Sequence, residues 1–239
     1  MKSNPFETLF REFVQGFGGE VLPEAPIGHT ADYFFPSDNI VAELKTLTED
    51  ATGKMKQKLQ PIVGAWIREN GKQPEGFVDG KQYIMELKSI PAEIAQHWLR
   101  LLRMPADHLI SDANRQIRDT KERLNLPLAK GLILIANEAN YYHNDPESYR
   151  LILANILRKR MPDGSPRFPH LHGAVYFSPL GGIQTRSEGM YFWANLIDDH
   201  ETPTAIFQRR LREGWYAFLE KTGTRVRQYS QPLQTHSSN

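Results

Sequence analysis

Two carboxylates and an amine are spaced so that a β-hairpin would bring them together. Asp32 comes early in one predicted strand, and Glu43 and Lys45 come late in the next. Side chains alternate between the two faces of a strand, so Glu43 and Lys45 point the same way while Leu44 points into the core. The sequence therefore predicts that Asp32, Glu43 and Lys45 converge at one edge of a sheet.

This set of groups suits the hydrolysis of a phosphodiester with a bound metal ion. Carboxylate oxygens are the ligands that Mg²⁺ prefers, and Mg²⁺ commonly takes only a few of them and keeps several waters. The metal lowers the pKa of a bound water and offsets the charge on the phosphate. A lysine can orient or deprotonate the attacking water, or hold a phosphate oxygen. Asp32 and Glu43 are thus the predicted metal ligands, and Lys45 is the predicted catalytic amine.

The hairpin itself is predicted from composition and alternation. Residues 30–35 and 40–44 are typical of strands, and the Pro-Ser-Asp-Asn segment between them favours a tight turn. Apolar residues at helical spacing from Phe6 to Phe17 predict an amino-terminal helix that starts at Asn4-Pro5 and stops at Gly18-Gly19.

The rest of the chain alternates between helical and strand patterns, which favours mixed α/β packing around a central sheet. We expect one domain over residues 1–239 with a loose tail from residue 228. The further predicted elements are a strand at 20–22, a mostly helical insertion at 49–105 with a loop around 71–80, a helix from Ser111 or Asp112 to about 124, a strand at 131–136, a helix at 146–160, strands at 173–177 and 190–196, and a helix at 203–221.

Composition excludes several classes of protein. The chain has 239 residues, no cysteine and a formal net charge of +1. Disulfides, thiolate catalysis and cysteine-ligated zinc are therefore excluded, and net charge alone does not demand a nucleic-acid partner. No stretch reaches the about 18 apolar residues of a membrane span, and no secretory signal follows Met1, so we expect a cytoplasmic protein without membrane contact.

At Asp32 and Glu43-Leu44-Lys45 the sequence resembles the PD-(D/E)xK nuclease superfamily, which includes restriction endonucleases and Holliday junction resolvases. The resemblance implies a restriction-endonuclease-like core and an Mg²⁺-dependent endonuclease, with Mn²⁺ able to substitute. It further implies a DNA substrate, a role in host defence or DNA repair, and a homodimer. It also implies a glutamate on the first helix near the metal; Glu7 is the matching position and Glu12 the fallback.

The resemblance covers a little over half the chain, and two features depart from the family pattern. Ala31 stands where the family usually has proline, and the insertion at 49–105 separates the lysine strand from the helix that should follow. We assign that core helix to the segment from Ser111 to residue 124. Some members carry a glutamine or a basic residue on this helix at the site, which makes Gln116 and Lys121 candidates.

A second copy of the motif competes with the first. Asp79, Glu86 and Lys88 also give an aspartate followed by Glu-Leu-Lys. Asp79-Gly80 is a turn signal, and Ile90-Pro91 suggests that Glu86 and Lys88 lie near the entry to a helix. The first copy is therefore preferred, although this alternative remains open.

Other polar groups favour structural explanations. Asp198-Asp199-His200 is typical of a solvated turn, His170 and His172 of structural or surface histidines, and Tyr141-Tyr142-His143 of either loop packing or base stacking. Basic clusters occur at 115–123, 158–160 and 209–212, and each could meet phosphates or be a solvated helix face. The alternative function is a catalytically inactive protein of the same fold that binds nucleic acid or acts as a scaffold.

Overall fold

The computed structural model describes residues 5–25, 28–49, 52–71, 91–138, 146–178, 192–195 and 203–222. Its centre is a six-stranded mixed sheet with the strands in sequence order. The outer pairs β1–β2, β2–β3 and β5–β6 are antiparallel, and β3–β4 and β4–β5 are parallel. The strands are β1 Glu20–Val21, β2 Tyr33–Phe35, β3 Ile40–Leu47, β4 Lys130–Asn137, β5 Gly173–Ser178 and β6 Phe192–Asn195.

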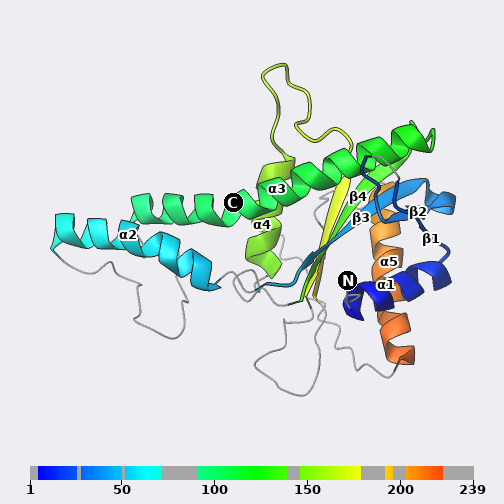
Figure 1. Cartoon of the computed structure of the whole chain (residues 1–239), viewed down its shortest axis with the longest axis horizontal. Coiled ribbons are helices and arrows are strands. Elements are labelled where there is room, and N and C mark those ends of the chain that lie inside the picture. Colours follow the sequence, from blue (N-terminus) through cyan, green and yellow to red (C-terminus); the bar gives the residue numbers. More distant parts are fainter. Residues whose placement is uncertain are drawn as a thin grey trace, which may run out of the picture.

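Helices cover both faces of this sheet (Figure 1). One core joins α1 and α5 to the sheet, with Trp215 and the phenylalanines of α1 at its centre. The other joins α3 and α4 to the opposite face through Ile133, Ile135 and Tyr176. The predicted α/β class, with a central mixed sheet flanked by helices, is confirmed. The helices are α1 Pro5–Gly16, α2 Thr52–Asn70, α3 Ala92–Arg123, α4 Pro146–Leu157 and α5 Pro203–Lys221.

The β2–β3 hairpin forms as predicted, with a shorter first strand. A 3-10 turn, η1 Pro36–Asp38, links the strands, and Asn39 closes the turn in the left-handed region at φ 52°. The strand begins at Tyr33, whereas we expected it to begin at residue 30. The preceding backbone is held elsewhere, because the N–H of Ala31 donates to Thr120 Oγ1.

Helix α3 corrects the prediction of a helix that begins at Ser111 or Asp112. It is one continuous helix of 32 residues that starts at Ala92. The reason is a stripe of buried residues at helical spacing that continues before and after Ser111 and Asp112. Packing of this stripe stabilises the helix through the position where we expected it to begin. The stripe consists of Ala106, Ile110, Ala113, Ile117 and Thr120.

The far end of α3 is closed by its own backbone. Asn125 adopts a left-handed φ of 53°, and the N–H groups of Leu126 and Asn125 donate to the carbonyls of Lys121 and Glu122. This is the hydrogen-bond pattern of a Schellman C-cap. It fixes where α3 ends and turns the chain back toward β4.

The helical region expected at 49–105 is an arm that projects from the sheet (Figure 1). Helix α2 runs outward from the end of β3, and the first part of α3 runs back alongside it. The arm has a small core of its own in which Val63 and Ile94 are buried against Trp66 and its neighbours. The loop expected around 71–80 and the tail from 228 lie outside the described residues.

Candidate active site

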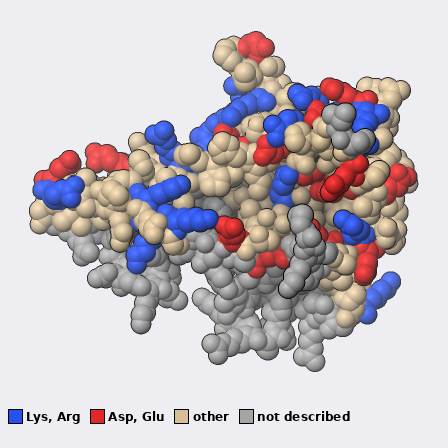
Figure 2. Space-filling model, in the orientation of Figure 1, with Lys and Arg blue, Asp and Glu red and all other residues tan. Residues whose placement is uncertain are grey.

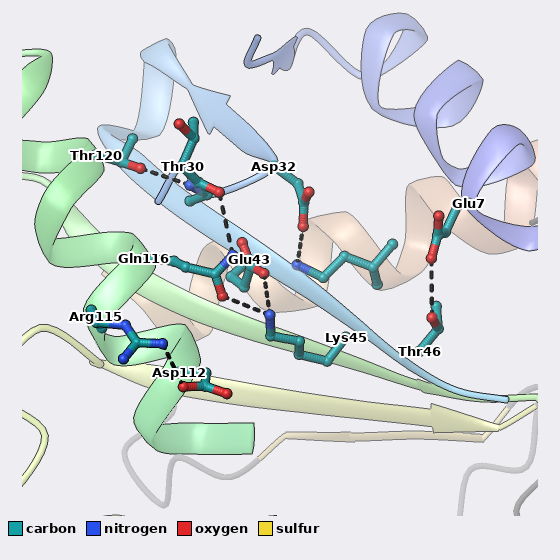
Figure 3. A network of polar contacts seen from close by, with 12 residues as sticks. Glu7, Thr30, Asp32, Glu43, Lys45, Thr46, Asp112, Arg115, Gln116 and Thr120 are labelled. Atoms are coloured by element: carbon teal, nitrogen blue, oxygen red, sulfur yellow. Dashed lines mark hydrogen bonds and ion pairs between the residues drawn. The ribbon is translucent and has the colours of Figure 1, made fainter. Parts of the chain in front are cut away.

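The site lies where β2 and β3 diverge. The hairpin pairs Tyr33 with Ala42, and β2 begins there, so within the described ranges no strand continues along this edge of β3 beyond Ala42. When the register of the hairpin is continued by one residue, Asp32 lies opposite Glu43. Its carboxylate accepts a hydrogen bond from the N–H of Leu44 at 2.8 Å. Asp32 thereby takes the place of a neighbouring strand on the open edge of β3 (Figure 3).

Glu43 and Lys45 share one face of β3, as alternation predicts. Lys45 Nζ lies 2.6 Å from Glu43 Oε1 and 2.6 Å from Gln116 Oε1 on α3. Leu44 points into the opposite core, where it packs with the α1 side. The expected convergence of Asp32, Glu43 and Lys45 therefore occurs, and Gln116, one of two candidates on the core helix, joins them.

Burial and mutual repulsion disfavour the state in which both carboxyl groups are ionised. Glu43 is only 2% exposed. Its pKa is raised to about 8, first by burial and then by the charge of Asp32, while Lys45 opposes the shift. The pKa of Asp32 is also raised by burial, against the lowering effects of the Leu44 N–H and Lys45. Two buried acids thus face a single amine.

Glu7 lies beside this group but on the other side of β3. Its Oε1 accepts a hydrogen bond from Thr46 Oγ1 at 3.0 Å. Thr46 alternates with Lys45 and so points to the α1 side of the sheet, as Figure 3 shows. Glu7 is close enough that its charge raises the pKa of Asp32. The fallback, Glu12, is exposed on α1.

Helix α3 contacts two parts of the site, the strand β3 and the backbone that leads into Asp32. Gln116 contacts Lys45, and one turn later the buried Thr120 accepts a hydrogen bond from the N–H of Ala31 at 2.7 Å. Sequence analysis assigned no role to Thr120. The signal that could have revealed its role is the spacing of four residues between Gln116 and Thr120, because residues at this spacing lie one above the other on a helix.

Lys121, the other candidate on the core helix, lies away from the site. Burial lowers the pKa of Lys121, and the charge of Lys130 lowers it further. His172 lies in the same region, and its ring Nδ1 is 3.1 Å from the N–H of Gly131. This contact agrees with the structural interpretation of the two histidines. The rival copy Asp79, Glu86 and Lys88 lies outside the described residues, as do Asp198-Asp199-His200 and Tyr141-Tyr142-His143.

The donors present fit a divalent cation of the magnesium type. Glu43 Oε2 is buried and, when the carboxyl is ionised, no group in the part of the chain that the structure describes donates a hydrogen bond to it. A cation there would satisfy this oxygen and relieve the repulsion between Glu43 and Asp32. No group of three His, Asp or Glu side chains that could hold a metal ion occurs among the described residues. Asp32 and Glu43 alone suffice for an ion that keeps most of its waters.

Comparison with family models, with curated proteins and with solved structures gave no match to this chain. Among the helices that the structure describes, none is both long and apolar enough to cross a membrane.

Proposed function

We propose that the chain is a metal-dependent nuclease that hydrolyses phosphodiester bonds in DNA, with a restriction-endonuclease-like core. The observation that carries the proposal is the convergence of Asp32, Glu43 and Lys45 at the open edge of β3. The order of elements adds support: with α2 set aside as part of the predicted insertion, a helix, a three-stranded antiparallel unit, the helix α3 and a parallel strand follow one another from α1 to β4. This is the order that the PD-(D/E)xK resemblance implies.

Each side chain has a role in this proposal. Asp32 and Glu43 bind Mg²⁺ or Mn²⁺, and Glu7, which lies on the α1 side of β3, assists through water and not as a direct ligand. When bound, the cation supplies charge stabilisation for the phosphate and acidifies water. Lys45 donates hydrogen bonds that position the attacking water or a phosphate oxygen. Gln116 fixes the ammonium, because its Oε1 accepts from Nζ at 2.6 Å.

The protonation of Glu43 sets a condition on this chemistry. With a pKa of about 8 in the free protein, Glu43 carries its proton for much of the time at neutral pH. A carboxyl group must lose that proton to bind a cation. Activity at limiting Mg²⁺ is therefore expected to rise with pH through the neutral range.

The direct test is cleavage of plasmid, linear and branched DNA with Mg²⁺ or Mn²⁺. Lys45→Ala and Asp32→Ala are each expected to lower the cleavage rate by at least about a hundredfold, because each removes a group from the reacting centre. Lys130→Ala, an exposed lysine on β4, is the charge-matched control and retains activity. Glu86→Gln retains activity as well if the first motif copy is the site. Cleavage that survives both Lys45→Ala and Asp32→Ala would refute the assignment.

A second candidate function is a nuclease-fold protein that binds nucleic acid, or acts as a scaffold, without cleaving. The 2.6 Å ion pair between Lys45 and Glu43 favours it, because that pair already occupies one predicted metal ligand. Titration calorimetry separates the two functions. Binding of Mg²⁺ or Mn²⁺ that Asp32→Ala abolishes supports the nuclease, and an absence of cation binding together with DNA binding supports the alternative. The homodimer, the cytoplasmic location and the role in defence or repair stay predictions.

A further inference from the structure

The projecting arm carries a basic face that the site does not use. Helix α2 has four basic residues and a single acidic one, Glu69, whereas the whole chain has a net charge of +1. Its first turn contains no acidic residue. Lys and Arg side chains gather over the arm in Figure 2.

Three of these residues lie on one side of α2. At about 100° per residue, Lys58 stands about 40° to one side of Lys54 and Arg68 about 40° to the other. All three side chains are exposed. The buried side, represented by Met55 and Leu59, is centred more than about 100° away and packs inward. We call Lys54, Lys58 and Arg68 the basic face of α2.

Two of the three charges of this face, Lys58 and Arg68, have no ion-pair partner among the described residues, and the third is weakly paired. On α3, Arg115 pairs with Asp112 and Arg118 with Asp119, and on α5 Arg210 pairs with Asp38. Lys58 and Arg68 form no ion pair with any side chain in the described ranges. Lys54 pairs with Glu49 at 2.9 Å, but both side chains are more than 70% exposed. Such an exposed pair is weak and exchanges readily for another anion.

The position of the face relates it to the candidate site. Strand β3, which carries Glu43 and Lys45, ends at Leu47, and α2 starts at Thr52 and runs outward from there. From Lys54 to Arg68 the face is about 21 Å long, at about 1.5 Å per residue. That length matches about six nucleotides of one duplex strand, at about 3.4 Å each.

We propose that the basic face of α2 binds the phosphate backbone of duplex DNA beside the point of cleavage. This inference rests on the proposed nuclease function for the nature of the partner. A row of solvated ammonium and guanidinium groups favours contacts to phosphates over contacts to bases. The arm therefore positions the duplex without reading its sequence.

The test measures binding in the absence of cleavage. Fluorescence anisotropy with a labelled duplex in EDTA gives the dissociation constant at several salt concentrations. Lys54→Gln/Lys58→Gln/Arg68→Gln is expected to raise the dissociation constant at least about tenfold and to lower the slope of log affinity against log salt by about 2 to 3. The matched control is Arg209→Gln/Arg212→Gln/Lys221→Gln on α5, which removes the same charge from the other side of the sheet. Circular dichroism verifies that both variants fold.

The outcomes separate this inference from the proposed function. An unchanged dissociation constant and salt slope in the α2 variant, or an equal loss in the α5 control, would overturn the role of the arm even if the wild type cleaves DNA. A specific loss in the α2 variant supports the arm even if no cation restores cleavage, in which case the nuclease proposal fails alone. Wild-type protein that does not bind duplex DNA, or that prefers single strands or RNA, would also overturn the inference.

Discussion

Two effects disfavour the ionised form of Glu43. Packing under α3 removes it from water, and Asp32 adds a second negative charge beside it. Because the pKa of Glu43 is higher in the folded protein than its ordinary value of 4.5, the folded state binds more protons than the unfolded chain between about pH 4.5 and pH 8. The free energy of unfolding therefore falls as pH rises across this window.

Glu43→Gln is expected to stabilise the metal-free protein at pH 8, by on the order of 2 kcal/mol, and to have little effect near pH 4.5. The amide keeps an acceptor for Lys45 and removes the buried charge. Urea denaturation at both pH values, with EDTA present, measures the difference. Glu12→Gln on the exposed side of α1 is the control with the same chemical change. A destabilisation at pH 8 would show that Glu43 is not under the repulsion described.

The convergence of Asp32, Glu43 and Lys45 could be predicted from the sequence alone, because a hairpin is local and strand alternation decides which side chains share a face. It could not predict the raised pKa of Glu43. That shift depends on burial beneath α3, whose contacting residue Gln116 is 71 positions beyond Lys45. It also left open the side on which Glu7 lies, since this depends on how α1 packs on the sheet.

Among the helices, α3 contributes most to the geometry of the site. It fixes Lys45 through Gln116, and through Thr120 it holds the backbone that leads into Asp32. The continuity of α3 was not predicted, because Ser111 and Asp112 are good cap residues and Pro105 interrupts the pattern. Packing decided the outcome, because the buried stripe of α3 begins at Ala106, directly after Pro105, and runs past Ser111 and Asp112.

Thr120→Val is expected to lower the free energy of unfolding by about 1 to 3 kcal/mol, since it leaves the buried N–H of Ala31 without an acceptor. It is also expected to speed hydrogen exchange at the Leu44 amide, whose acceptor Asp32 is then less firmly placed. Two-dimensional NMR measures the exchange, and Thr120→Ser, which keeps the hydroxyl, should behave like the wild type. Loss of stability without faster exchange at Leu44 would show that Thr120 stabilises the core but does not position Asp32.

The described part of the molecule consists of a central sheet packed between two apolar cores and a projecting arm. One apolar core packs on each face of the sheet. The site lies at the open edge of β3, beyond the pairing of β2 with Ala42. The arm that begins at Thr52 extends outward from this point (Figure 1). The helical pattern of residues 49–105 predicted the helices of the arm, but not the extension of the core helix into the arm as the first part of α3. That extension depends on contacts between α2 and α3, such as Val63 with Ile94.

The proposed nuclease requires that Asp32 and Glu43 hold a divalent cation at the edge of β3. A crystal structure of the protein soaked in Mn²⁺, with anomalous difference density, would show whether they do. We predict one strong peak within bonding distance of both carboxylates, about 2.2 Å, with Glu43 released from Lys45. No peak at that position under saturating Mn²⁺, with the Lys45–Glu43 ion pair intact, would contradict the claim.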